Sequence, residues 1–234
     1  MESDHIVRIS ELVHKVVQNN RVYVTFTNYP YLDQFYVLYM TSKLWRYPNF
    51  MVVAIDQKTY DILSQQGFPV ALVKASYLER YSNDYASNYG DHNFNILVKM
   101  KLVIINRILA ENVSCLMFDS DVIIFKDPLE DEKDIENFDF LAQVDEHICT
   151  GFMYFNPTPK SMLLMEQSLL RMKDREMNDQ DIIQEIIMSN VISGIKWKLF
   201  PSETYSKGSI YFNAHQFPWT PTCTFSLTYL FNIF

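Results

Sequence analysis

The sequence predicts an α/β fold whose first half is doubly wound and whose second half is a more irregular α+β arrangement. Over residues 6–73, segments with helical spacing of apolar residues alternate with short apolar runs. This alternation is the pattern of a parallel sheet with crossover helices. A further helix and strand then run directly into Asp119-Ser120-Asp121, after which the alternation is lost.

Two spacings define the elements of the first half. Ile6, Ile9 and Val13 lie on one face of the segment 6–17, which predicts an amphipathic helix. Residues 22–26 (VYVTF) are β-branched or aromatic and predict a buried strand. The elements expected next, in chain order, are a helix over 33–44, a strand over 50–55, a helix over 59–66, a strand over 69–73, a polar connection over 76–93, a helix over 95–109 and a strand over 114–118.

Short strands dominate the prediction after residue 121. Apolar runs at 122–125 and 138–144 flank an acidic segment and predict two of these strands. The elements expected beyond them are strands over 151–155, 197–200 and 209–212 and helices over 159–171 and 179–188. The chain shows no internal repeat that would indicate a repeat architecture.

Length and composition exclude several classes of protein. The 234 residues, of which 48% are hydrophobic, suffice for one sizeable core. Five glycines lie too far apart for a G-x-G-x-x-G or Walker phosphate loop. No apolar run approaches the ~18 residues of a membrane helix, and the N-terminus lacks a signal-peptide pattern. Three cysteines (Cys115, Cys149 and Cys223) leave one disulfide or three thiols open.

Negative charge is concentrated in one segment. The formal net charge is −8, which disfavours a nucleic-acid or anionic-membrane partner. Residues 119–146 hold eleven Asp and Glu and two Lys, a net of −9, which leaves +1 for the rest of the chain. The acidity therefore marks a site or an acidic loop, and we interpret residues 130–136 as a solvated loop.

Asp119 and Asp121 directly follow a predicted buried strand, and ligands of open α/β sheets bind outside the carboxyl ends of strands. Two carboxylates supply part of an octahedral shell, as in Mg²⁺ or Mn²⁺ sites that substrate phosphates complete. The same residues could instead cap backbone amides in a turn. Their place at the end of a strand favours the metal site.

Two enzyme classes share this local pattern. Leu116–Val122 resembles the motif of haloacid-dehalogenase-type phosphatases, in which the first Asp is a nucleophile. That family places the motif near the N-terminus and follows a later strand with an acidic pair. Here three predicted strands precede the motif, and the downstream Asn178-Asp179-Gln180-Asp181 opens a helix. This class is therefore the more distant alternative.

The second class is supported by six pieces of the chain that occur in one order. They are Val24–Asn28 with Tyr31–Asp33, Val53–Asp56, Lys101 at 18 positions before Asp119, Phe118–Val122 with Asp127-Pro128, Val144–Glu146 with Thr150–Tyr154, and Asn178–Gln180. Together they resemble the nucleotide-diphospho-sugar transferase family, which includes plant arabinosyltransferases and the xylosyltransferases of rhamnogalacturonan II. The resemblance implies a GT-A-like (Rossmann-like) fold, with a mixed central sheet flanked by helices.

The resemblance also implies a set of site residues. Those implied to bind the nucleotide sugar are Thr25, Thr27, Asn28, Asp56, Lys101, Ser120 and Gly151. Those implied to act in catalysis are Asp145, Asp179 and Gln180. Asp119 and Asp121 would hold Mn²⁺ or Mg²⁺, with His215 as a candidate third ligand. Structural alternatives stay open for three of these residues: Lys101 as a solvated lysine, Asp179 as a helix cap, and Gly151 as part of a strand-entry turn.

We therefore expect a single domain that moves a sugar from a nucleotide-diphosphate-sugar donor, a UDP-sugar first of all, to a glycan or protein acceptor with retention. Residues 1–121 would form the nucleotide-binding half, residues 122–216 the acceptor- and sugar-binding half, and residues 217–234 an atypical tail, as in a truncated chain. The resemblance implies a Golgi lumenal location, although the chain shows no anchor. The alternative is a catalytically degenerate domain that binds a nucleotide sugar or a protein, because the family's His-x-Asn-Trp-like segment is missing after residue 209.

Overall fold

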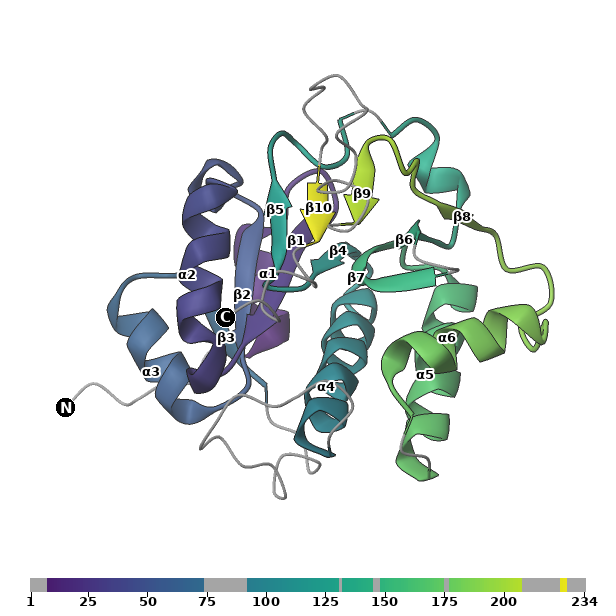
Figure 1. Cartoon of the computed structure of the whole chain (residues 1–234), viewed down its shortest axis with the longest axis horizontal. Helices are drawn as coiled ribbons and strands as arrows, with labels where there is room; N and C mark the ends of the chain where they lie inside the picture. The colour runs from purple at the N-terminus through teal and green to yellow at the C-terminus, as the bar shows by residue number, and fades with distance from the viewer. Residues whose placement is uncertain are drawn as a thin grey trace.

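A mixed seven-stranded sheet forms the centre of the molecule (Figure 1). The computed structural model describes residues 8–73, 92–130, 132–144, 148–174, 177–207 and 224–226. The strands of the central sheet lie in the order β3-β2-β1-β4-β7-β6-β8. Their bounds are, in chain order, β1 Arg21–Thr27, β2 Phe50–Ala54, β3 Val70–Leu72, β4 Ser114–Phe118, β6 Phe140–Val144, β7 Ile148–Phe155 and β8 Trp197–Leu199.

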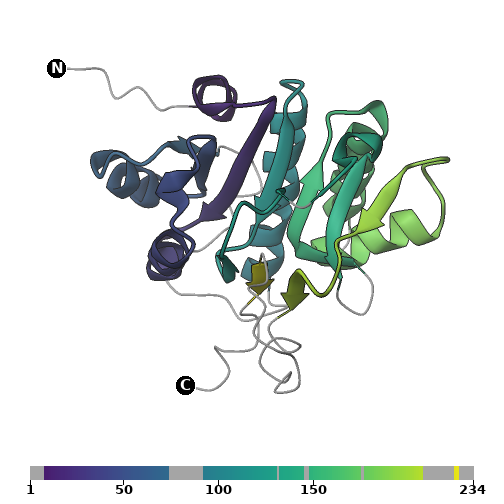
Figure 2. The ribbon, with the colours of Figure 1, turned by 90° about the horizontal axis from the view of Figure 1, so that it is seen from above.

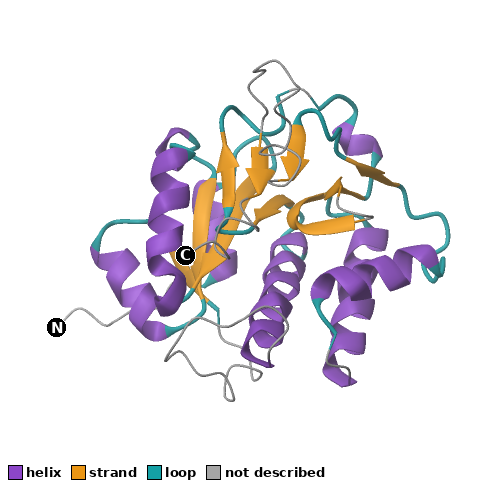
Figure 3. Ribbon diagram, in the orientation of Figure 1, coloured by secondary structure: helices purple, strands orange, loops and turns teal. Residues whose placement is uncertain are grey.

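Helices cover both faces of this sheet (Figures 2 and 3). Buried side chains of α1, α4, α5 and α6 join one apolar cluster on the sheet, and those of α2 and α3 join another. The bounds of the helices are α1 Ile9–Val16, α2 Leu32–Thr41, α3 Gln57–Gln65, α4 His92–Leu109, α5 Pro159–Asp174 and α6 Asp179–Met188. Within the part of the chain that the structure describes, no helix is both long and apolar enough to cross a bilayer. The predicted α/β fold with a mixed central sheet is confirmed.

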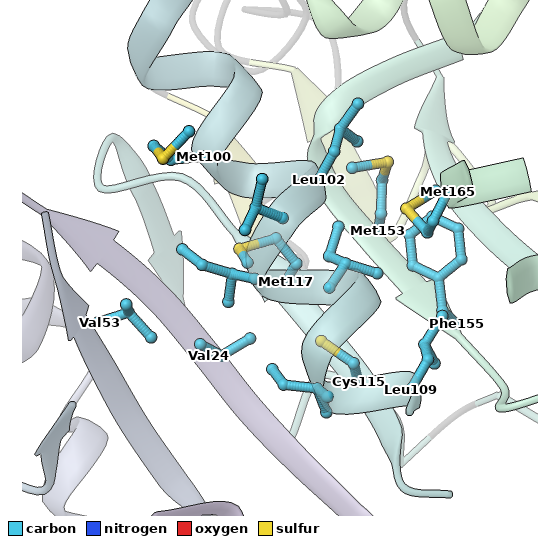
Figure 4. Close-up of a cluster of buried hydrophobic side chains, with 14 of the residues drawn as sticks. Val24, Val53, Met100, Leu102, Leu109, Cys115, Met117, Met153, Phe155 and Met165 are labelled. Carbon is cyan, nitrogen blue, oxygen red and sulfur yellow. The ribbon is translucent and has the colours of Figure 1, made fainter. Parts of the chain in front are cut away.

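The long helix α4 packs along the middle of the sheet (Figure 4). Met100, Leu102 and Leu109 of α4 are buried in the same cluster as Val24 of β1 and Met117 of β4. Apolar burial of this kind contributes roughly 1.5–3 kcal/mol for each large side chain. Because these contacts hold α4 against the sheet, the other residues of α4 also have fixed positions.

The direction of the strands determines which chain segments meet at the edge that carries Asp119. β3, β2, β1 and β4 are parallel, whereas β7 runs antiparallel to β4. Phe118 therefore pairs with Phe152, and the backbone N–H of Asp119 donates a 2.9 Å hydrogen bond to the carbonyl oxygen of Gly151. The carboxyl ends of β1, β2 and β4 thus share one edge with the part of β7 around Gly151.

A second sheet has three strands, in the order β5-β10-β9. β5 (Val122–Ile124) follows the Asp119-Ser120-Asp121 turn directly. β10 (Thr224–Ser226) pairs antiparallel with β5 and parallel with β9 (Tyr205–Lys207). A segment of the predicted tail over 217–234 therefore pairs with the strand next to the two aspartates.

Most predicted elements are present with ends shifted by a few residues, and the predicted bounds of β4 and α6 are those of the structure. The helix predicted over 33–44 is wrong at its end, because α2 stops at Thr41 and a separate 3₁₀ turn covers Leu44–Arg46. Lys43 between them adopts a φ of 51°, which an α-helix cannot continue through. The predicted strand over 209–212 lies outside the described residues, and the prediction contained neither β9 nor β10.

The interpretation of residues 130–136 as a solvated loop is wrong for Glu132. Its side chain is only 4% exposed and forms a 3.0 Å ion pair with Lys198 of β8. Nearby, Asp127 accepts a 2.8 Å hydrogen bond from the hydroxyl of Tyr23. Burial of this hydroxyl and the neighbouring Asp127 charge raise the pKa of Tyr23 above its ordinary value. Glu132 and Asp127 therefore bind part of the acidic segment to strands of the central sheet.

Asn156, directly after β7, connects the acidic segment to the centre of the sheet. Its side-chain oxygen accepts hydrogen bonds from the hydroxyls of Ser114 (3.0 Å) and Tyr154 (3.1 Å). Its amide nitrogen donates to the carbonyl oxygens of Ile135 (2.8 Å) and Phe138 (2.7 Å). One side chain thus satisfies four polar groups in a largely buried region.

Replacing Asn156 with Ala removes these four hydrogen bonds, each at a cost of about 1 kcal/mol. We expect Asn156→Ala to lower the free energy of unfolding by about 3 kcal/mol in urea titrations. The matched control is Asn137→Ala at an exposed position of the same segment, which should change it by less than about 0.5 kcal/mol. Equal effects of the two substitutions would contradict the prediction.

Candidate active site

Lys101, near the middle of α4, is the most deeply buried charged group of the candidate site. It is 2% exposed, so the alternative of a solvated lysine is wrong. Its Nζ lies 2.9 Å from Oδ1 and 3.1 Å from Oδ2 of Asp119, and 3.0 Å from Oδ2 of Asp179. It also donates a 3.1 Å hydrogen bond to the carbonyl oxygen of Thr150. One ammonium group therefore joins α4, the end of β4, β7 and the start of α6.

Asp179 is held at the first turn of α6, where the helix dipole favours a carboxylate. Its neighbour Asn178 caps this helix, because the Asn178 side-chain oxygen accepts a 2.8 Å hydrogen bond from the backbone N–H of Asp181. The N-cap of α6 is therefore Asn178, and Asp179 occupies the first helical position. Asp179 is 3% exposed and directs its carboxylate to Lys101. An Asn before Asp-Gln at a predicted helix start is a capping signal that the sequence already contained.

The charges of the site shift one another's pKa values. The pKa of Asp119 is raised to about 6, because loss of solvent and the charges of Asp121 and Asp179 together outweigh the lowering effect of Lys101. Burial by itself would lower the pKa of Lys101, but Asp119 and Asp179 outweigh it and hold that pKa above its ordinary value. Lys101 is therefore charged at neutral pH.

Because Gly151 has no side chain, one side of the Asp119 carboxylate is left uncovered. A Cβ atom at this position would lie 3.4 Å from Oδ2 of Asp119 and 3.5 Å from Sγ of Cys149. The backbone of Gly151 requires no left-handed conformation. A Cβ atom would therefore fit here in ordinary contact with the carboxylate, and Cys149 is a neighbour of the site that the sequence reasoning missed.

Asp56 uses both carboxylate oxygens to join the ends of β1 and β2. Oδ1 accepts a 2.9 Å hydrogen bond from the backbone N–H of Thr59 and so caps α3. Oδ2 accepts hydrogen bonds from the hydroxyl of Thr59 (2.8 Å) and the backbone N–H of Tyr29 (2.9 Å). Its predicted contact with a nucleotide stays a prediction, and its present contacts shape the loop after β1.

The other predicted residues differ in their surroundings. Three of those expected near the nucleotide are buried on or just after β1: Thr25, Thr27 and Asn28. The hydroxyl of Thr25 has no hydrogen-bond partner among the described residues. Ser120 and Gln180 are partly exposed, and Asp145 and His215 lie outside the described residues. The structure thus brings Lys101, Asp119, Gly151 and Asp179 together.

The chemistry of Asp119 and Asp121 fits a hard divalent cation. Oxygen ligands from one or two carboxylates are typical of Mg²⁺ and Mn²⁺ sites that a phosphate-bearing ligand completes. Oδ1 of Asp119 is buried 2.9 Å from Nζ of Lys101, and Oδ1 of Asp121 is buried as well. No group of three His, Cys, Asp or Glu residues within the described ranges could hold a metal. The protein here offers part of a coordination shell rather than a closed one.

The fold is a mixed sheet flanked by helices, with paired aspartates directly after a central strand. The family model for "Nucleotide-diphospho-sugar transferase" matches residues 46–228, which is most of the chain. The chain therefore belongs to the nucleotide-diphospho-sugar transferase family. This membership replaces the phosphatase alternative, and the match extends into the predicted tail.

Two Arabidopsis thaliana proteins are similar in sequence. Beta-arabinofuranosyltransferase RAY1 is 28% identical over 144 residues, which cover 61% of this chain and 26% of that protein. Arabinosyltransferase XEG113 is 23% identical over 198 residues, which cover 76% of this chain and 30% of that protein. This chain thus spans less than a third of the length of the relatives it matches.

Solved glycosyltransferase structures share the fold. The glycosyltransferase GlyE of Streptococcus pneumoniae TIGR4 superposes with a TM-score of 0.55 at 17% identity, over 88% of this chain and 54% of that one. Mouse xyloside xylosyltransferase 1 gives a TM-score of 0.52 at 10% identity, over 88% of this chain and 96% of that one. At these identities the likeness establishes the GT-A-like fold.

Because Asp179 belongs to a buried ion pair, its substitution should lower the free energy of unfolding more than substitution of its neighbours. Asp179→Asn leaves Lys101 with one carboxylate fewer, and breaking a buried pair typically costs about 3–5 kcal/mol. Because Asp119 still compensates Lys101, we expect a loss of about 2–3 kcal/mol in the free energy of unfolding, measured by urea denaturation. Asp181→Asn, two residues further along α6, should cost less than about 1 kcal/mol. A reversed order of the two variants would refute this account of the site.

Proposed function

We propose that this chain transfers a sugar from a nucleotide-diphosphate-sugar donor to a glycan or glycoprotein acceptor, with a divalent cation held by Asp119 and Asp121. The observation that carries this proposal is the Asp119 carboxylate. It lies at the carboxyl end of a central strand, is oriented by Lys101 and is left open by Gly151. Carboxylates at this edge are where open α/β sheets bind ligands.

A bound cation would neutralise the donor's diphosphate and act as a Lewis acid on the leaving group. The protein's contribution is to fix the position of the carboxylates. Lys101 orients Asp119, and we assign roles toward the sugar to Asp179 and Gln180, which occupy the first turn of α6. We propose that Asp145, which falls between β6 and β7 in the sequence, also takes part in catalysis.

Retention of the anomeric configuration is part of the proposal. Asp179, a carboxylate that could act as a nucleophile, is buried and paired with Lys101. A paired, buried carboxylate is poorly suited to attack a sugar carbon. We therefore favour a front-face reaction in which the departing diphosphate assists the acceptor hydroxyl.

The names of the two plant relatives suggest the donor to test first. Both are described as transferring arabinose, one of them in its furanose form. We propose a UDP-linked pentose as the donor, with UDP-arabinofuranose as the first probe. We propose that the nucleoside binds at the carboxyl ends of β1 and β2, which Asp56 joins.

Removing both aspartates should abolish cation-dependent donor binding. We expect Asp119→Asn with Asp121→Asn to weaken binding of UDP-arabinofuranose in the presence of Mn²⁺ by at least about 100-fold, measured calorimetrically. Loss of an outer-shell partner of a metal already costs about 10–100-fold. The matched control, Glu130→Gln with Glu136→Gln, removes two exposed charges from the same acidic segment and should leave binding unchanged.

Unchanged donor binding in the Asp119→Asn, Asp121→Asn variant would contradict the proposed cation site. The wild-type protein should also release UDP slowly by donor hydrolysis when Mn²⁺ is present. Donor binding without any such release would favour the binding-module alternative over the enzyme.

The Gly151→Ala substitution should change donor binding without a comparable change in the stability of the fold. The added methyl group contacts Oδ2 of Asp119 at 3.4 Å, an ordinary van der Waals distance, so the fold should tolerate it. The methyl group covers the carboxylate, and we expect Mn²⁺-dependent donor binding to weaken by roughly tenfold, or about 1.4 kcal/mol. The free energy of unfolding should change by less than about 1 kcal/mol. Wild-type affinity in a stable Gly151→Ala protein would show that this side of Asp119 is not used.

A further inference from the structure

The donors of the Lys101 ammonium are all engaged by the protein. An ammonium group has three N–H donors, and three groups surround Nζ at 2.9–3.1 Å: the carboxylates of Asp119 and Asp179 and the carbonyl oxygen of Thr150. With 2% of its surface exposed, Lys101 has little room for a further partner. A direct contact with the donor would break one of these bonds, so Lys101 acts through the carboxylates.

The two carboxylates of this group are not equivalent. Asp179 is nearly as buried as Lys101, whereas about a third of the Asp119 side chain is exposed. A cation can therefore approach only the Asp119 side of the buried group. Asp119, Asp121, Asp179 and Lys101 together carry a formal charge of −2, and Lys101 supplies the only positive charge among these four groups.

A cation on Asp119 would lie beside a fixed positive charge. Because both would bind the same carboxylate, their separation would be only a few ångströms, and like charges at such distances repel strongly in a partly buried site. The diphosphate of a nucleotide adds negative charge on the far side of the cation and offsets this repulsion. Cation and nucleotide should therefore bind together better than the cation binds alone.

We infer that Lys101 is a positioning residue that orients Asp119 and at the same time restrains its affinity for a cation, so that a divalent cation binds tightly only with a diphosphate. This inference rests on the proposed function. It assigns the ammonium a role in the order of binding, rather than in contact with the sugar. Coupling between two ligands is reciprocal, so the nucleotide should likewise bind tightly only with the cation.

Titration calorimetry at pH 8 with Mn²⁺ alone, and with Mn²⁺ in saturating UDP, tests the inference. In the wild type, UDP should strengthen Mn²⁺ binding at least about tenfold. Lys101→Met should bind Mn²⁺ alone at least about tenfold more tightly than wild type and should show reduced coupling to UDP. Lys99→Met, on a partly exposed position of the same helix, is the control and should behave as wild type. A purely structural lysine would instead give weaker Mn²⁺ binding when replaced.

A second pair of variants covers a Lys101→Met protein that does not fold. Replacing both members of a buried ion pair is often better tolerated than replacing one. Lys101→Met with Asp179→Asn should bind Mn²⁺ alone more tightly than Asp179→Asn, because the two differ only in the ammonium charge. Equal or weaker binding in the double variant overturns the inference.

The outcomes separate the inference from the proposed function. If UDP strengthens Mn²⁺ binding in the wild type but removal of Lys101 leaves Mn²⁺ affinity unchanged or lower, the inference fails alone. If the wild type shows no Mn²⁺-dependent UDP binding, the proposed function fails and the inference fails with it.

Discussion

A buried ammonium group has to be balanced by negative charge from the protein, and Lys101 obtains that balance from segments far apart in the sequence. Asp119 follows β4, Asp179 begins α6, and the carbonyl oxygen of Thr150 belongs to β7. Burying one charge without a partner costs several kcal/mol. These segments must therefore converge for α4 to pack on the sheet, and the candidate site is the place where they converge.

The reversal of strand direction between β4 and β7 makes this convergence possible. In a fully parallel sheet, the strand next to β4 would present its carboxyl end to Asp119. Here β7 runs antiparallel and presents Gly151, with the carbonyl oxygen of Thr150 beside it. The glycine keeps the carboxylate open, and the carbonyl holds the lysine. The mixed sheet thus supplies two different functions within adjacent residues.

Local pattern was enough to predict β4, α6 and the aspartates that follow β4, because a compact apolar run and a 3.6-residue spacing leave few alternatives. The same patterns could not predict β9 or β10, which are three residues long and exist through pairing with β5 and each other. Nor could they decide whether Lys101 is solvated. A lysine next to an apolar helix face is usually exposed, and its burial here depends on carboxylates 18 and 78 positions away.

The acidic segment contains charges of two kinds, and the difference bears on the proposed role of a cation. Glu132 is paired with Lys198, and Asp127 and Asp139 accept hydrogen bonds from Tyr23 and from the backbone N–H of Lys196. These groups are compensated within the protein and serve the fold. Asp119 shares its only cationic neighbour in the described structure with Asp179, and the negative charge of Asp121 lies close to it. Under the proposed function, the same site would be too negative to receive a diphosphate directly and too close to Lys101 to bind a cation strongly by itself. Each ligand would remove the obstacle to the other, so the two conditions are compatible only if cation and diphosphate bind together.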